Sequence, residues 1–111
     1  GVICTEMGAS EADGDHGPYL DKTDAWIDYL NANNISWCNW SLSNQGVTSA
    51  AFMPYVAGVS DGTSLDPGSG KVWTEDELTV SGEYMRARIK GIEYNPIDRT
   101  KKYFNKTDMG F

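Results

Sequence analysis

The chain has 111 residues, a length that suits one small domain and is too short for two ordinary ones. It is 40% hydrophobic and 23% charged, a composition typical of globular proteins and not of disordered chains. No apolar run approaches the roughly 18 residues that a membrane span needs, and a formal net charge of −7 disfavours nucleic acid, so neither membrane nor nucleic acid is an expected partner. No leader precedes the first predicted strand, which we expect of a mature chain or a fragment.

The first forty residues predict a strand, a loop, a helix and a second strand. Residues 2–5 are apolar and rich in β-formers, and the polar, glycine-containing loop 9–18 follows them. Apolar residues at helical spacing predict a helix over residues 19–33, with Asp21 or Thr23 as its cap.

The second predicted strand covers residues 35–40, which alternate in polarity. Residues 41–72 hold five glycines and two prolines and are interpreted as a loop, long enough to suggest a functional role. Thr74 and Glu77 have the spacing of a capping box. A second helix is predicted over residues 81–90, and Gly91 is expected to end it.

This order of elements predicts an α/β fold with a parallel sheet whose strands are buried on both faces. Two strands leave two open edges and do not form a stable parallel sheet on their own. The sequence therefore predicts part of a larger fold that is incomplete by itself.

Two residues at predicted strand ends are candidates for chemistry, because ligands bind at the carboxyl ends of parallel strands. Glu6 is either a catalytic carboxylate or a solvated residue at the start of a loop. Trp40 is either an apolar platform for a sugar ring or a core residue. Trp37 is interpreted as core.

Other reactive side chains give weaker signals. Cys4 and Cys38 are expected to be buried thiols, although a disulfide between them stays conceivable. The acidic loop of Glu11, Asp13 and Asp15 lacks the spacing of a twelve-residue calcium loop and is interpreted as solvated. No metal site and no cofactor are predicted.

Several sequence blocks resemble glycoside hydrolase family 5, and more narrowly the bacterial endo-β-1,4-glucanases, or cellulases, of that family. The Thr-Glu-x-Gly block around Glu6 and the Ser-Trp-x-Asn-Trp-Ser-Leu block around Trp40 are the most specific. The matching stretches are residues 2–8, 14–21, 25–30, 34–43, 73–79 and 81–82.

The resemblance implies a (β/α)8 TIM barrel, of which this chain supplies the C-terminal part, from strand 7 to helix 8. Residues 1–91 then form the C-terminal quarter of the catalytic barrel, and residues 92–111 are an extension of unknown role. The implied partner is the N-terminal part of the same barrel, strands 1–6.

The resemblance also implies hydrolysis of internal β-1,4-glucosidic bonds with retention. Glu6 matches the family's nucleophile, and the acid/base glutamate belongs to strand 4, outside this sequence. Trp40 matches the aromatic platform, and Ala12 matches a position whose backbone lies beside the next glucose. Gln45 stands where many relatives carry a lysine, and it retains hydrogen-bonding ability.

Val47 stands where relatives carry an acid, so the preferred glucan stays open. The alternatives are a family 5 hydrolase acting on mannan, xyloglucan or mixed-linkage glucan, and a non-catalytic carbohydrate-binding module with Trp37, Trp40 and Trp73 as its platform. We expect the isolated chain to be inactive. We expect a secreted or extracellular location, because the implied β-glucan polysaccharide does not enter cells.

Overall fold

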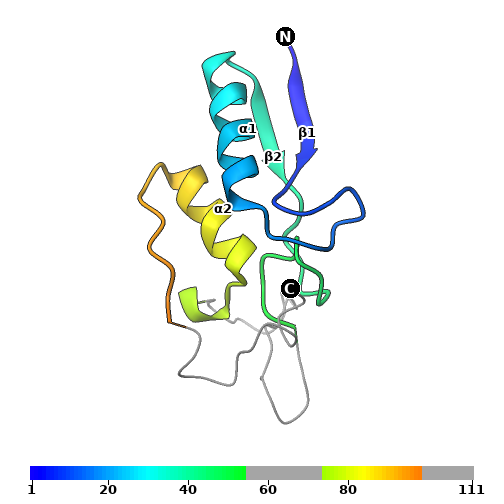
Figure 1. The fold of residues 1–111 in the computed structure, drawn as a ribbon, viewed down its shortest axis with the longest axis vertical. Coiled ribbons are helices and arrows are strands. Elements are labelled where there is room, and N and C mark those ends of the chain that lie inside the picture. The colour runs from blue at the N-terminus through cyan, green and yellow to red at the C-terminus, as the bar shows by residue number, and fades with distance from the viewer. Residues whose placement is uncertain (55–73, 99–111) are drawn as a thin grey trace, which may run out of the picture.

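The computed structural model describes residues 1–54 and 74–98. Two short strands, β1 (Ile3–Met7) and β2 (Ser36–Asn39), lie side by side, and helix α1 (Leu20–Ala32) connects them (Figure 1). The predicted strand–helix–strand unit is therefore confirmed, with boundaries that shift by one or two residues.

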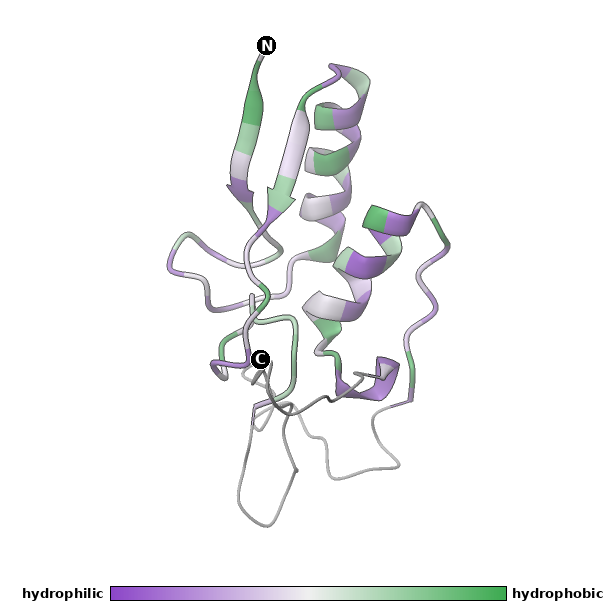
Figure 2. Cartoon of the chain, turned by 180° about the vertical axis from the view of Figure 1, so that it is seen from behind, coloured by the Kyte–Doolittle hydropathy of each residue, from purple (hydrophilic) through white to green (hydrophobic). Residues whose placement is uncertain are grey.

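The second half of the described structure contains a short 3-10 helix, η2 (Glu75–Glu77), and helix α2 (Val80–Lys90). The two helices lie next to each other in Figure 1. Figure 2 shows η2 as a hydrophilic turn below α2. Within residues 1–54 and 74–98, no helix is both long and apolar enough to cross a membrane.

The two strands pair in parallel, as predicted. Ile3 pairs with Ser36 and Cys4 with Trp37, and then the register shifts before Met7 pairs with Asn39. Such a shift bends the strand locally. It occurs just where Glu6 projects from β1.

The core lies between the strands and the two helices. Its buried cluster is Met7, Ile27, Tyr84 and Met85, which come from β1, α1 and α2. Trp37 packs against this cluster, and its indole N–H donates to Asn31 Oδ1 at 3.1 Å. Trp37 is therefore a core-facing residue, as predicted.

The other face of the strands is not covered by the described residues, so burial on both faces stays a prediction about the complete fold. The side chains of Ile3, Thr5 and Glu6 are exposed, as is Trp40 just after β2. Ile3 alone is 56% exposed. The physical reason is that the described elements are too few to cover both faces of the pair.

Two helix caps differ from the sequence-based expectation. At α1, Tyr19 is the N-cap and no side chain caps the helix, so the prediction of Asp21 or Thr23 is wrong. Thr23 Oγ1 donates instead to the Tyr19 carbonyl at 2.7 Å. At α2, Thr79 Oγ1 accepts from Gly82 N at 3.0 Å, so the helix begins one residue earlier than predicted.

The predicted capping box of Thr74 and Glu77 is present, although it starts η2 and not a long α-helix. Gly91 ends α2 with φ of 65°, as predicted. A left-handed residue at this position is the usual way to end a helix.

Residues 92–98 fold back onto α2. The Tyr94 ring meets the Tyr84 ring edge-on, with centroids 5.5 Å apart, and Ile97 N donates to Glu83 Oε1 at 2.9 Å. The first part of the predicted extension thus contributes to packing. Its remainder, residues 99–111, and the predicted platform residue Trp73 lie outside the described residues.

Candidate active site

An open pocket of about 410 Å³ lies at the carboxyl end of the two strands. It is bordered by the end of β1, by Trp40 and by the loop that follows β1. The lining residues are Glu6, Met7, Gly8, Ser10, Glu11, Ala12, Asp13, Gly14 and Trp40.

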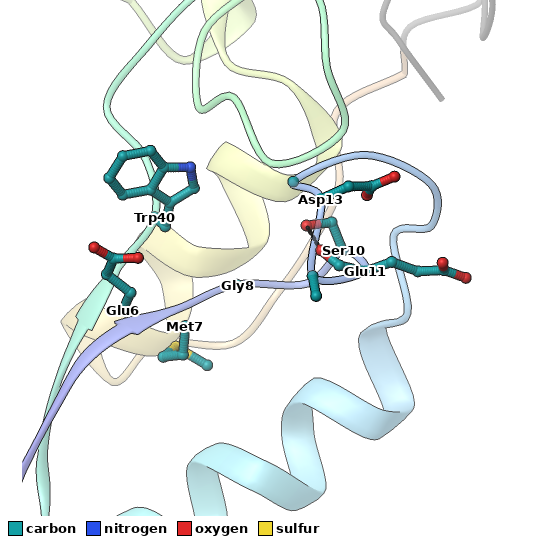
Figure 3. A pocket seen from close by; sticks show the side chains of 9 residues that line it. Glu6, Met7, Gly8, Ser10, Glu11, Asp13 and Trp40 are labelled. Atoms are coloured by element: carbon teal, nitrogen blue, oxygen red, sulfur yellow. Dashed lines mark hydrogen bonds between the residues drawn. The ribbon is translucent and has the colours of Figure 1, made fainter.

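Glu6 and Trp40 lie beside each other at one border of this pocket. Figure 3 shows the Glu6 carboxylate and the Trp40 indole extending from neighbouring strands toward the same space, while Met7 points to the opposite side. Trp40 is 52% exposed, so its ring is available to a ligand and is not a core residue. Both candidate residues therefore border the same pocket at the carboxyl ends of the two strands.

The backbone fixes the spacing between the two strand ends. Trp40 N donates to the Met7 carbonyl at 2.8 Å. A Cβ added at Gly8 would lie 2.9 Å from the Trp40 carbonyl oxygen, a distance that a side chain does not tolerate. The glycine of the Thr-Glu-x-Gly block therefore permits the close approach that holds Trp40 beside Glu6.

The two other predicted sugar-binding residues, Ala12 and Gln45, differ in their position relative to the pocket. Ala12 is exposed and lines the pocket, as its predicted role requires. Gln45 is exposed on the loop after β2 and is not among the lining residues. Its predicted contact with a more distant sugar stays a prediction.

The acidic loop is solvent-exposed at Glu11 and Asp13, as predicted, and its side chains also make local hydrogen bonds. Glu11 Oε1 accepts from the Tyr19 hydroxyl at 3.0 Å, which raises the pKa of Tyr19. Asp13 Oδ1 accepts from Asp15 N at 2.9 Å, and its other oxygen lies 3.3 Å from His16 Nδ1. Figure 3 shows the Glu11 and Asp13 carboxylates pointing away from Glu6.

Asp15, the third acid of this loop, forms hydrogen bonds with Thr48 in the loop after β2. Its Oδ1 accepts from both the backbone N and Oγ1 of Thr48, each at 3.0 Å. The backbone N–H of Thr48 is the main cause that lowers the pKa of Asp15, followed by the backbone N–H of His16 and the Thr48 hydroxyl. The sequence carries no signal for this contact, because the two residues are 33 positions apart.

Residues 1–54 and 74–98 contain neither a metal-binding cluster nor a disulfide bond. No group of three or more His, Cys, Asp or Glu side chains there is arranged to hold a metal ion. Cys4 and Cys38 are free thiols. Cys4 is half-buried against the core cluster, whereas Cys38 is exposed, so the prediction of a buried thiol is wrong for Cys38.

Comparison with known proteins identifies the family. The model of the family "Cellulase (glycosyl hydrolase family 5)" matches residues 1–46. An endoglucanase of Halalkalibacter akibai is 60% identical over 100 residues, which are 90% of this chain and 12% of that protein. The chain belongs to glycoside hydrolase family 5.

Solved structures of family 5 enzymes agree with the fold. The catalytic domain of alkaline cellulase K is 58% identical and superimposes with a TM-score of 0.81, over 88% of this chain and 28% of that one. The Thermobifida fusca endoglucanase Cel5A catalytic domain, solved with cellotetraose, is 26% identical with a TM-score of 0.64, over 80% of this chain and 26% of that one. This chain therefore spans between an eighth and a third of the family 5 relatives named above.

Proposed function

We propose that this chain forms part of the active site of a retaining endo-β-1,4-glucanase, with Glu6 as the nucleophile. The observation that carries the proposal is the exposed Glu6 carboxylate beside the Trp40 indole at the carboxyl end of two parallel strands. Active sites of parallel barrels lie at this end. Three curated relatives that are 57–60% identical bear the name endoglucanase.

The described elements fit the C-terminal part of a (β/α)8 barrel. On this proposal β1, α1, β2 and α2 are strand 7, helix 7, strand 8 and helix 8, and residues 1–91 belong to the barrel. Such a barrel has about 250 residues, which agrees with the modest share of each solved relative that this chain covers. The open face of β1 and β2 would then turn toward strands 1–6.

The chemistry needs a second carboxyl group. A Glu6 oxygen attacks the anomeric carbon while a glutamic acid protonates the glycosidic oxygen. The bond between the anomeric carbon and the glycosidic oxygen breaks. Water, deprotonated by that second glutamate, then releases the sugar from Glu6. In retaining enzymes the two carboxyl groups lie about 5–5.5 Å apart. The partner glutamate belongs to the N-terminal part of the barrel, and no cofactor is required.

The pocket supplies sugar-binding surfaces beside Glu6. The exposed Trp40 ring offers a flat apolar face, and its indole N–H is a hydrogen-bond donor. Ala12 lies on the loop at the opposite border of the pocket, where its backbone would flank the next glucose. Gln45 would reach more distant hydroxyls. The substrate class is a β-glucan oligosaccharide or polysaccharide, and a secreted enzyme is the form that meets such a polymer.

The choice of glucan is the alternative within this proposal. Val47 offers no polar group to a sugar, and Gln45 lies outside the pocket, so mannan, xyloglucan or mixed-linkage glucan stays a second candidate. The described residues do not favour a carbohydrate-binding module. Such modules are usually β-sandwiches, whereas the strands here are parallel and Trp37 packs into the core.

The deciding experiment replaces Glu6 in the complete enzyme. Glu6→Gln keeps the size of an exposed side chain but removes the nucleophile, so activity on carboxymethyl cellulose is expected to fall about a thousandfold or more. Glu93→Gln makes the same chemical change at an exposed residue that does not line the pocket, and it should keep full activity. NMR of the first-formed product anomer tests retention.

The isolated chain provides a second test. It is expected to be inactive alone, and mixing it with a fragment that carries strands 1–6 should restore hydrolysis. The restored activity should be absent when the chain carries Glu6→Gln. Hydrolysis by the pure chain alone, or full activity of the Glu6→Gln enzyme, would contradict the proposal.

A further inference from the structure

Two loops that are far apart in the sequence border the pocket, and one short segment joins them. We call residues 9–18 the first loop and residues 41–54 the second loop. Thr48 and Ser49 of the second loop are both buried, and they contact the first loop directly. Thr48 bonds to the Asp15 carboxylate through its N and Oγ1, and Ser49 N donates to the Gly14 carbonyl at 3.0 Å.

The same segment also contacts the backbone next to Trp40. Ser41 N donates to the Ser49 carbonyl at 3.1 Å, and Ala51 N donates to the Ser41 carbonyl at 3.0 Å. Ser41 directly follows Trp40 in the chain. The hydrogen bonds of Thr48 and Ser49 therefore connect Asp15 with Ser41, the residue that directly follows Trp40.

We propose that Asp15 is a positioning residue that sets the distance between the first loop and the Trp40 platform, and so sets the affinity of the pocket for a sugar ring. The inference rests on the proposed function of Trp40. Asp15 does not line the pocket, so it acts through Thr48 and not by touching the sugar. It is half-buried, and Thr48 is fully buried, so water competes weakly for these bonds.

Both Thr48 donors meet one oxygen, Asp15 Oδ1. The amide oxygen of an asparagine in the same rotamer can accept the same two hydrogen bonds, in a weaker form because it carries no charge. An alanine side chain accepts neither bond.

The tight packing at the joint supports the same interpretation. Gly14 has φ of +84°, and a Cβ there would lie 3.2 Å from the Ser49 Oγ. The first loop thus packs closely against Ser49 of the second loop at a residue that also lines the pocket. A displacement of the second loop is therefore expected to change the border of the pocket.

Steady-state kinetics of the complete enzyme on cellotetraose test the inference. Asp15→Ala is expected to raise KM about tenfold with kcat changed less than about threefold, because the platform is displaced while Glu6 is not. Asp15→Asn should have a KM within about twofold of the wild type. Thr48→Val, which removes the hydroxyl bond and keeps the backbone bond, should lie between the two.

A double-mutant cycle separates positioning from a general structural role. If Asp15 acts through Trp40, Asp15→Ala should change KM little in an enzyme that already carries Trp40→Ala. Additive effects on KM, or a wild-type KM for Asp15→Ala, would overturn the inference. If Asp15→Ala does not fold, a Thr48→Val enzyme with wild-type KM overturns it equally.

The two proposals fail in different ways. If the wild-type enzyme does not cleave cellotetraose, or Glu6→Gln stays active, the proposed function itself is wrong. If Glu6→Gln is inactive and Asp15→Ala binds cellotetraose like the wild type, only the positioning role is wrong.

Discussion

The two faces of the β1–β2 pair differ in what they contact. On one face Met7 and Trp37 pack with α1 and α2, and the side chains are buried or half-buried. On the other face the described residues leave Ile3, Glu6 and Trp40 exposed. The covered face therefore holds the elements together, while the open face carries the groups that can do chemistry.

This division predicts different results for substitutions on the two faces. Changes on the covered face should lower the free energy of unfolding of the complete enzyme and spare the chemistry of molecules that fold. Changes at Glu6 and Trp40, which border the pocket, should instead lower activity or binding and change stability little. The four predictions below run from the largest expected effect to the smallest.

Ile27→Ala should have the largest effect on stability. Ile27 is fully buried in the core cluster, and its truncation leaves a cavity among Met7, Tyr84 and Met85. The free energy of unfolding, measured with urea, should fall by about 2–5 kcal/mol. Tyr29→Ala on the exposed face of the same helix is the matched control and should change stability by much less.

Gly82→Ala tests the junction between α2 and the second loop. A Cβ at this position would lie 2.1 Å from the Ala51 carbonyl oxygen, so the helix or the loop must move. We expect a loss of about 1–3 kcal/mol or more in urea unfolding. Lys90→Ala, an exposed site in the same helix, should be close to neutral, and equal stability of the two variants would contradict the packing described above.

Trp40→Ala is the corresponding test on the open face. Because the ring is half exposed, stability should change little, but the dissociation constant for cellotetraose should rise about tenfold. Isothermal titration into the inactive Glu6→Gln enzyme measures binding without hydrolysis. Trp40→Phe keeps an aromatic face and should recover part of the affinity; a recovery no better than alanine would argue against stacking.

Tyr84→Phe should have the smallest effect and one that depends on pH. Tyr84 donates to Asp24, which also pairs with Arg88 at 3.3 Å. Burial, and then this hydrogen bond, raise the pKa of Tyr84 above its ordinary value of 10.0. Its hydroxyl therefore contributes stability that is complete below pH 10 and declines above it, as the unfolded state ionises first.

The measurement compares urea unfolding of the wild type and Tyr84→Phe at pH 8 and pH 11. A difference of about 1 kcal/mol is expected at pH 8 and a smaller one at pH 11. A difference that grows with pH would show that the hydroxyl is not held in its neutral form by the fold.

Local patterns predicted most of the elements, and they placed two candidate residues that border one pocket. Hydrophobic spacing located α1 and α2, alternation located β2, and Gly91 marked the end of α2. Since parallel strands end at the same edge, Glu6 and Trp40 both lie there. These features depend on residues that are close in sequence or on a general rule of topology.

Features that depend on distant segments were not predictable. The Asp15–Thr48 bond joins two loops whose approach follows from the whole arrangement. The cap of α1 was predicted wrongly because Thr23 bonds backward to Tyr19 within the helix, an option that a cap rule does not consider. The predicted burial of both strand faces depends on elements other than those described, so it stays a prediction.

The contacts between the start of α2 and the second loop determine which positions of this loop tolerate amino-acid substitutions. Thr79 Oγ1 donates to the Ala50 carbonyl at 2.5 Å, and Thr79 N donates to the Ala51 carbonyl at 3.0 Å. Met53 N donates to the Glu77 carbonyl at 2.8 Å. Residues 50–53 are buried under these bonds, whereas Gln45 and its neighbours have partial or full access to solvent. Directed libraries that aim to change the preferred glucan should therefore randomise residues 43–47 and leave residues 50–53 constant.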